Sequence, residues 1–291
     1  MNQINQRQNL PKSIKLLAAQ RQTYSNAKSL LGIYALLAIP LMLLVNLVLK
    51  PFILNHYEFD LTNLIAILAL LLTLLDVLWL KDYVRTLQEK AATIQEEFDR
   101  YVYNLKWDPI LLGEKVSDVC VEKMYSKYAE SHELSKLHDW YTPTVSQHSE
   151  LKGILLCQNE NVGWDIELRN SYIAYVLVFI IIFVLSLIYL GVSNKATLES
   201  FIMSYFIPSM PILIYFRNAY SDHRKAVKDK TKLRDSLKNA LDSQNIKIKT
   251  VESIQFQILN NRKTNPLIFD FFNYIKSERL QRLITSATKS L

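Results

Sequence analysis

The residues best suited to metal binding or nucleophilic chemistry fall in one polar stretch of the chain. They are Cys120, His132, His138, His148 and Cys157. Their spacings match no zinc-binding pattern, and the sequence contains no phosphate-binding loop, dinucleotide-binding glycine turn, G-x-S-x-G or H-E-x-x-H motif. We therefore expect no catalytic residues, no metal site, no cofactor and no enzymatic activity. Two free, reduced cysteines are typical of a cytosolic compartment.

A second group of candidate residues lies in strongly apolar sequence. Asp76 is the only charged residue of the run Leu61–Leu80, and a carboxylate inside a membrane is costly enough to suggest a pore, a cavity or a polar partner. Alternatively, Asp76 lies within one turn of the membrane interface and pairs with Lys81. Pro208 and Pro211 indicate a bent or broken helix, which a membrane tolerates where neighbours or water satisfy the freed carbonyls. We take Asp76, Pro208 and Pro211 as candidate pore-lining residues.

Four apolar runs position these residues, namely Leu30–Leu49, Leu61–Leu80, Tyr172–Val192 and Phe201–Phe216. Tyr172–Val192 has no charged residue, and at about 1.5 Å per residue its helix matches the roughly 30 Å hydrocarbon core of a bilayer. The alternative is a buried core helix of a large soluble protein, because a helix that is apolar on every side has no face for water. We predict an all-α membrane protein with four transmembrane helices in two hairpins and cytosolic helical regions.

Composition divides the chain further. Hydrophobic residues make up 50% of its 291 residues, which is too polar for a protein lying wholly in lipid. We predict a cytosolic basic N-terminal segment (1–29), a first transmembrane hairpin (30–81), a cytosolic helical block (82–170), a second transmembrane hairpin (171–216) and a cytosolic helical tail (217–291).

Charge sets the predicted topology. Segment 1–29 has no acidic residue, and 217–238 holds eight Lys or Arg against three Asp. Basic flanks of this kind stay on the cytoplasmic side, so both termini are expected there. The net charge of +7 is then explained by loops facing anionic lipid, and we expect no nucleic-acid binding.

Two apolar seams continue from the predicted spans into polar sequence. One covers 84–105 and the other 226–240; their members recur at alternating steps of three and four and are apolar except for Lys230. Such a seam joins subunits as a coiled coil, or packs an ordinary amphipathic helix against its own subunit. Trp107-Asp108-Pro109 is expected to end the first helix.

Several short motifs then carry a resemblance over nearly the whole chain. They are Gln6-Arg7-Gln8-Asn9, the stretch 15–21, Asp139-Trp140-Tyr141, Cys157-Gln158 and Leu168-Arg169. Their order, together with two span pairs, resembles the S-4TM family of four-transmembrane pore-forming effectors from bacterial cyclic-oligonucleotide anti-phage systems (CBASS). One position departs from the family, since Asn159-Glu160 follows Cys157-Gln158 where a basic residue is expected.

The resemblance implies a function. A cyclic oligonucleotide, made by a partner nucleotide cyclase, would bind on the cytosolic side. A homo-oligomer would then open a pore or lesion in the lipid of the bacterial inner membrane and cause abortive infection. The alternative is a membrane-anchored scaffold or receptor that conducts nothing and acts through protein partners.

The resemblance also suggests ligand-binding residues. Phosphate recognition favours arginine, whose planar fork makes paired charge-assisted hydrogen bonds. The family-matching cytosolic arginines are Arg7, Arg21 and Arg169. Trp140 and Tyr141 offer faces on which a base could stack.

Overall fold

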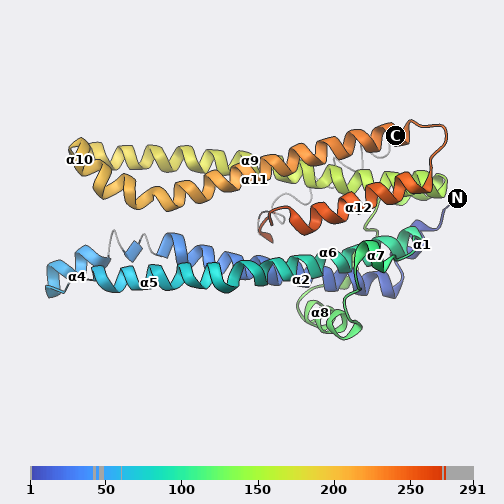
Figure 1. Cartoon of the computed structure of the whole chain (residues 1–291), viewed down its shortest axis with the longest axis horizontal. Coiled ribbons are helices and arrows are strands. Elements are labelled where there is room, and N and C mark those ends of the chain that lie inside the picture. The colour runs from blue at the N-terminus through green and yellow to red at the C-terminus, as the bar shows by residue number, and fades with distance from the viewer. Residues whose placement is uncertain (1, 42–43, 46–48, 60, 271, 273–291) are drawn as a thin grey trace. The chain divides into compact units, whose positions relative to one another are not determined.

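The structure is a computed structural model that describes residues 2–41, 44–45, 49–59, 61–270 and 272 (Figure 1). Every regular element within these residues is a helix, and none is a strand. The predicted all-α class is therefore confirmed. The chain divides into two compact units, each built from segments that are far apart in the sequence.

The first unit, which we call the polar unit, consists of Met1–Lys28, Arg85–Asn170 and Lys225–Leu291. Its helices are α1 (Ile4–Gln8), the first part of α2 (Pro11–Leu36), most of α6 (Lys81–Tyr103), α7 (Pro109–Leu112), α8 (Asp118–Ser131), the first part of α9 (Glu150–Ser193), the last part of α11 (Ile207–Leu241) and α12 (Ile248–Thr264). Two 3-10 turns, Leu134–Leu137 and Pro143–Gln147, lie between α8 and α9.

One hydrophobic core joins the long helices of the polar unit. Leu17 of α2, Phe98 of α6, Leu155 of α9, Leu237 of α11 and Ile258 of α12 all belong to it and are buried. Burial of a side chain of this size stabilises a fold by about 1.5–3 kcal/mol. The core therefore fixes the faces that these five helices turn toward one another.

Both predicted seams pack inside this core. Ile94 and Phe98 from the first seam, and Leu233 and Leu237 from the second, are at most 3% exposed. The structure thus shows the second alternative, in which each seam packs against its own subunit. The hypothesis that the seams join subunits is wrong for these side chains, because contacts within the chain already cover them.

Helix α6 ends at Tyr103, before the predicted break at Trp107-Asp108-Pro109, because Asn104 takes a left-handed φ of +56° and the Leu105 N–H bonds to the Arg100 carbonyl. The predicted triad instead begins the next helix. Asp108 accepts a hydrogen bond from the backbone N–H of Ile110 at 3.0 Å, which caps α7, and Pro109 takes the first helical position. Gly113 then ends α7 with φ of +79°, a left-handed conformation that glycine adopts without a steric penalty.

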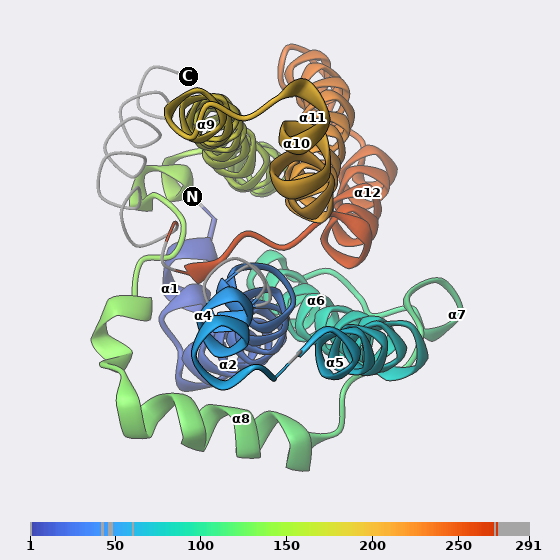
Figure 2. The same ribbon diagram turned by 90° about the vertical axis from the view of Figure 1, so that its left-hand side faces the viewer.

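The second unit, which we call the apolar unit, consists of Ser29–Val84 and Ser171–Arg224. It contains the remainder of α2, α4 (Lys50–Tyr57), α5 (Thr62–Leu75), the remainder of α9, α10 (Leu198–Phe201) and the start of α11. In this unit α9 and α11 lie side by side in both views (Figure 1, Figure 2), with the rings of Phe179 and Phe216 4.2 Å apart between centroids.

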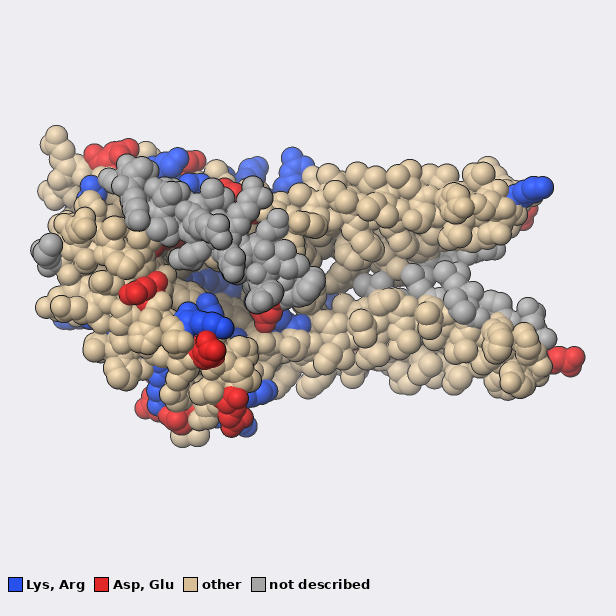
Figure 3. Space-filling model, turned by 180° about the vertical axis from the view of Figure 1, so that it is seen from behind, with Lys and Arg blue, Asp and Glu red and all other residues tan. Residues whose placement is uncertain are grey.

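Large apolar side chains of the apolar unit face outward. Leu78 is 74% exposed, and Ile182 and Leu185 are each 59% exposed. The long uncharged surfaces in Figure 3 belong to this unit, and charged side chains appear only at their ends. Exposed apolar surface on this scale marks a membrane or partner contact, because water would not stabilise it.

Two helical runs in the described part of the chain are long and apolar enough to cross a membrane, Asn63–Tyr103 and Glu150–Ser193. They contain the third predicted span and all of the second except its first two residues. The first predicted span, Leu30–Leu49, includes residues 42–43 and 46–48, which lie outside the described residues. The fourth, Phe201–Phe216, is divided among α10, the π-helical turn Ile202–Phe206 and α11. The count of four spans therefore stays a prediction.

Candidate functional site

A buried network of charged side chains lies in the polar unit. Helix α6 supplies Glu96, Asp99 and Arg100, whose spacing of three and four residues places them on one helical face. Helix α12 supplies Gln255 and Arg262. Arg262 Nη1 lies 2.6 Å from Asp99 Oδ2, and Arg100 Nε donates to Glu96 Oε1 at 2.7 Å. Gln255 Nε2 donates to Glu96 at 2.7 Å and to Asp99 at 3.1 Å, so one amide joins both carboxylates.

Hydrogen bonds extend this network to α9 and to the turn before it. The Tyr141 hydroxyl donates to Asp99 Oδ1 at 2.6 Å. Gln158 Nε2 of α9 donates to Gln255 Oε1 at 3.0 Å. Gln8 in α1 bonds to the backbone of Tyr141 in both directions, at 2.8 and 3.1 Å. Asp99 and Gln255 each bond to several partners, which gives the network a specific geometry, while Gln158 Oε1 and Arg262 Nη2 are buried without a hydrogen-bond partner among the described residues.

Burial strongly affects Glu96. It raises the pKa of this carboxyl group from 4.5 to about 7, and the neighbouring Asp99 adds to the increase. Arg262 and Arg100 oppose the shift without reversing it. Within the polar unit, Glu96 therefore changes its charge near neutral pH.

We expect the stability of the polar unit to fall as pH rises from about 4.5 to about 7. Over this window the folded state holds a proton on Glu96 that the unfolded chain has lost, so deprotonation favours unfolding. The loss amounts to at most roughly 3 kcal/mol. Urea unfolding at pH 5 and pH 7.5 measures it, and Glu96→Gln should flatten the dependence. An equal pH dependence in the variant would assign it to another group.

A second ion cluster lies close by in the same unit. Asp165 of α9 accepts from Arg169 Nε at 2.7 Å and from Lys230 Nζ of α11 at 3.0 Å. Burial alone would raise the pKa of Asp165, but the two cations hold it below its usual range. Burial lowers the pKa of Lys230, and Asp165 offsets part of that effect. The predicted local pair of Asp165 and Arg169 is thus present, with a third member from α11.

The sequence-predicted ligand residues occupy three different places. Arg21 and Trp140 come together, with the guanidinium 5.0 Å from the ring centroid. Arg7 binds Glu150 and the backbone oxygen of Val102. Arg169 lies in the Asp165 cluster and also donates to the backbone oxygen of Pro266 at 2.9 Å.

Tyr141 is too buried to offer the stacking face that we expected from the sequence. It is 2% exposed, and its ring lies 6.2 Å from Phe98 and 5.6 Å from Tyr103 between centroids. Its hydroxyl group instead joins the buried network. Trp140, whose ring contacts Arg21, is the more accessible member of this pair of residues.

The departure from the family motif has a structural consequence. Glu160 Oε2 accepts a hydrogen bond from the backbone N–H of Thr142 at 3.1 Å. Glu160 therefore helps to hold the turn that carries Trp140 and Tyr141. A basic side chain could not accept this bond.

Of the pore-lining candidates, Asp76 makes a defined contact. Its carboxylate lies 3.0 Å from Lys81 Nζ, with side chains 16% and 70% exposed respectively. A π-helical turn, Asp76–Leu80, begins at this residue, and another, Ile202–Phe206, directly precedes α11, which contains Pro208 and Pro211. Such widened turns occur often at functional positions in helices.

We expect Asp76→Asn to be nearly silent. The pair with Lys81 is largely open to solvent on the lysine side, and exposed pairs contribute about 0–1 kcal/mol. Thermal unfolding and ion-flux selectivity measure the effect, with Lys81→Gln as the matched variant that removes the same pair. A change in ion selectivity for Asp76→Asn alone would place its carboxylate on a conducting path.

Metal chemistry finds no geometric support in the part of the chain that the structure describes. No three His, Cys, Asp or Glu side chains there come together as a metal site. Cys157 is buried and Cys120 is half-buried, and both are free thiols. We call the Glu96–Asp99–Arg262 network and the Asp165–Arg169–Lys230 cluster the polar centres of this unit.

Helices that run from a buried polar network into exposed apolar segments define an all-helical protein with candidate membrane-spanning segments. The model of the SMODS-associating 4TM effector domain matches residues 2–291, and the chain belongs to this family. A probable CBASS effector molecule from Bacillus cereus (strain VD146) is 27% identical over 158 residues. These residues are 54% of this chain and 52% of that protein, so the match spans about half the length of the relative. No solved structure matches the chain.

The family and the relative together support an effector role in CBASS. The 4TM family and the two long apolar helices also indicate a membrane protein.

Proposed function

We propose that this protein is a membrane effector of anti-phage defence that a cyclic oligonucleotide activates from the cytosolic side. One observation carries the proposal beyond family membership. Helix α9 contains Gln158 and Asp165 of the polar centres and the uncharged run Tyr172–Val192 in one unbroken helix, Glu150–Ser193. When Gln158 or Asp165 moves, the same helix therefore carries that movement to the apolar run, which is long enough to cross a membrane.

The other long helices support the same coupling. Glu96 and Asp99 lie in the helical run Asn63–Tyr103, whose first part is apolar. Lys230 lies in α11, which begins in the apolar unit. Each polar centre thus contains residues from at least one helix that continues into the apolar unit. Binding of a phosphodiester anion near these charges would change which ion pairs are favourable, and the helices would respond.

The proposed output is a pore or lesion in the bacterial inner membrane that causes abortive infection. The topology is multi-pass with both termini cytoplasmic, and a partner nucleotide cyclase supplies the ligand. The protein acts by conduction, without turnover of the nucleotide. Four helices of one subunit pack around their own side chains and leave little room for water. A conducting path therefore requires a homo-oligomer in contact with lipid.

Two measurements test this proposal. Calorimetry with a panel of cyclic di- and trinucleotides should show binding to the full chain in detergent, and the recovered nucleotide should be chemically unchanged. Light scattering should show an oligomer when the ligand is present. A protein that binds no cyclic oligonucleotide, or stays monomeric with ligand bound, would contradict the proposal.

A further inference from the structure

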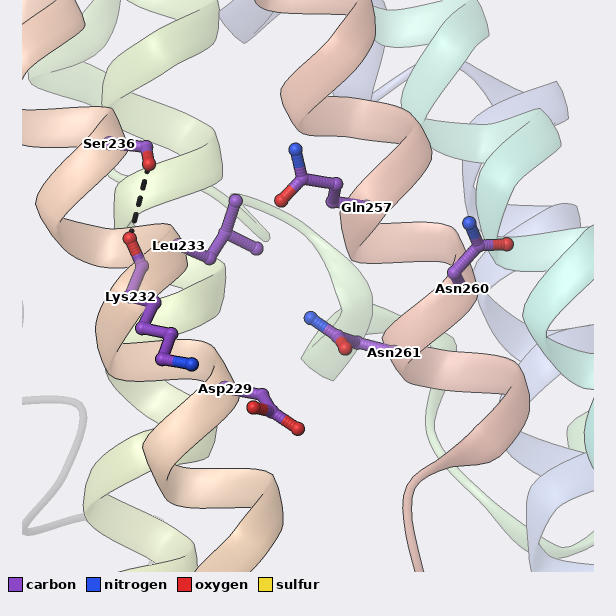
Figure 4. Close-up of a pocket in the computed structure, with 7 residues that line it drawn as sticks. All are labelled: Asp229, Lys232, Leu233, Ser236, Gln257, Asn260 and Asn261. Atoms are coloured by element: carbon purple, nitrogen blue, oxygen red, sulfur yellow. Dashed lines mark hydrogen bonds between the residues drawn. The ribbon is translucent and has the colours of Figure 1, made fainter.

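A groove lies between α11 and α12 in the polar unit and has a volume of about 300 Å³ (Figure 4). Its lining residues are Asp229, Lys232, Leu233, Ser236, Gln257, Asn260 and Asn261. The volume is at the lower end of small-ligand pockets, and it suits one nucleobase with its ribose better than a whole cyclic oligonucleotide.

The groove has an apolar floor and polar walls. Leu233 is 3% exposed and forms part of the core beneath the groove. Gln257 and Asn261, one turn apart on α12, reach toward α11, where Asp229 and Lys232 lie (Figure 4). Gln257 is exposed and Asn261 is half-buried, and no other group among the described residues bonds to either carboxamide, so both face the groove or solvent. An apolar floor for a ring and carboxamides for its edge are the features that recognise a nucleobase.

The carboxamide side chains in the walls of the groove favour adenine over guanine. A carboxamide presents one donor and one acceptor side by side, which complements the amino group and ring nitrogen of adenine. The corresponding edge of guanine presents two acceptors, which arginine or lysine satisfies better. Carboxamides outnumber both the single cation and the single carboxylate of this groove. Lys232 remains as the cationic donor for a phosphate.

We propose that the groove between α11 and α12 binds an adenine base of the activating cyclic oligonucleotide, with Gln257 and Asn261 reading its edge and Lys232 contacting the adjoining phosphate. This inference rests on the proposed function and names the ligand subsite within it. It places the subsite away from Arg7 and Arg21, where the sequence alone suggests the ligand.

The location gives the subsite a direct connection to the buried charges. Asn261 precedes Arg262, and Asp229 precedes Lys230, so each wall adjoins a member of the ion clusters. A ligand that draws the two walls together moves α11 and α12 relative to each other. Because α11 is one helix from Ile207 to Leu241, that movement is carried along it.

Calorimetry on the full-length protein with cyclic di-AMP and cyclic di-GMP tests the proposal. Wild type should bind cyclic di-AMP about tenfold or more tightly than cyclic di-GMP. The double variant Gln257→Ala, Asn261→Ala should lose about tenfold or more of the affinity for cyclic di-AMP. Asn239→Ala is the matched control, because it removes an exposed carboxamide from α11 outside the groove, and it should bind like wild type.

The outcomes distinguish a failure of the groove assignment from a failure of the proposed function. If wild type binds cyclic di-AMP and the double variant, with an unchanged melting temperature, binds equally well, the groove is not the subsite and the proposed function stands. A preference of wild type for cyclic di-GMP overturns the assignment to adenine. If wild type binds no cyclic oligonucleotide of a wider panel, the activation step of the proposed function fails, and this inference fails with it.

Discussion

Replacing Arg262 with methionine is expected to destabilise the polar unit by about 3–5 kcal/mol, since it removes one partner of a buried ion network. The Arg262 side chain is 8% exposed, and Asp99 and Glu96 beside it are 1% and 0% exposed. Methionine keeps much of the arginine volume, so the loss is mainly electrostatic. Asp99 would remain buried without the cation that pairs with it, while the pKa of Glu96, already raised to about 7, would rise further and keep that side chain neutral. Urea unfolding of the detergent-solubilised protein measures the effect.

Arg85→Met is the matched control for this change. Arg85 bonds Glu89 at 2.9 Å on the surface of α6, with side chains 73% and 44% exposed. An exposed pair one helical turn apart contributes only about 0.3–0.5 kcal/mol. Similar losses for Arg262→Met and Arg85→Met would show that the buried network does not stabilise the unit as described.

Ser171→Pro is expected to uncouple the polar unit from membrane activity. Ser171 lies inside α9 at the start of the apolar unit, just before the uncharged run. Proline there removes the N–H of one helical hydrogen bond and collides with the carbonyl one turn earlier, at a cost of about 3 kcal/mol or more. Ligand-dependent dye release from liposomes should fall about tenfold or more, while calorimetric affinity for the ligand changes by less than about threefold.

Ser171→Ala controls for loss of the hydroxyl group and should release dye like wild type. Continued release by Ser171→Pro, at the wild-type rate and with the protein inserted in the membrane, would contradict transmission along α9. Loss of ligand binding in the same variant would show instead that the polar unit itself had been disrupted.

The sequence predicts those features that local chemistry determines. Lipid requires an uncharged run such as Tyr172–Val192, so α9 is visible in the composition alone. The start of α7 is equally local, because Asp108 and Pro109 provide a cap and a first helical residue. The Asp165–Arg169 pair follows from helical spacing and is confirmed at 2.7 Å.

The buried network could not be predicted in the same way. Glu96, Asp99 and Arg100 have the composition of a solvated helix face, and their partner Arg262 follows Asp99 by 163 residues. Lys230 lies in a strongly basic segment that the positive-inside rule assigns to the lipid surface, yet it is 5% exposed. Only the tertiary fold brings these charges together.

The helical tail predicted for 217–291 includes α12 but gives it no bounds, although α12 supplies Gln255, Arg262 and one wall of the groove. Lys247 precedes it without a side-chain cap, so its start has no sequence signal. The buried positions Val251, Ile254 and Ile258 do recur at steps of three and four, and that periodicity would have revealed it.

Ligand-dependent leakage from liposomes tests the central claim most directly. Purified full-length protein is reconstituted in dye-loaded vesicles, and cyclic di- and trinucleotides are added one at a time. We expect that a nucleotide that binds in calorimetry releases dye rapidly, and that vesicles without protein stay intact. Binding of a cyclic oligonucleotide to the reconstituted protein without any release of dye or ions would contradict the account and favour a non-conducting scaffold.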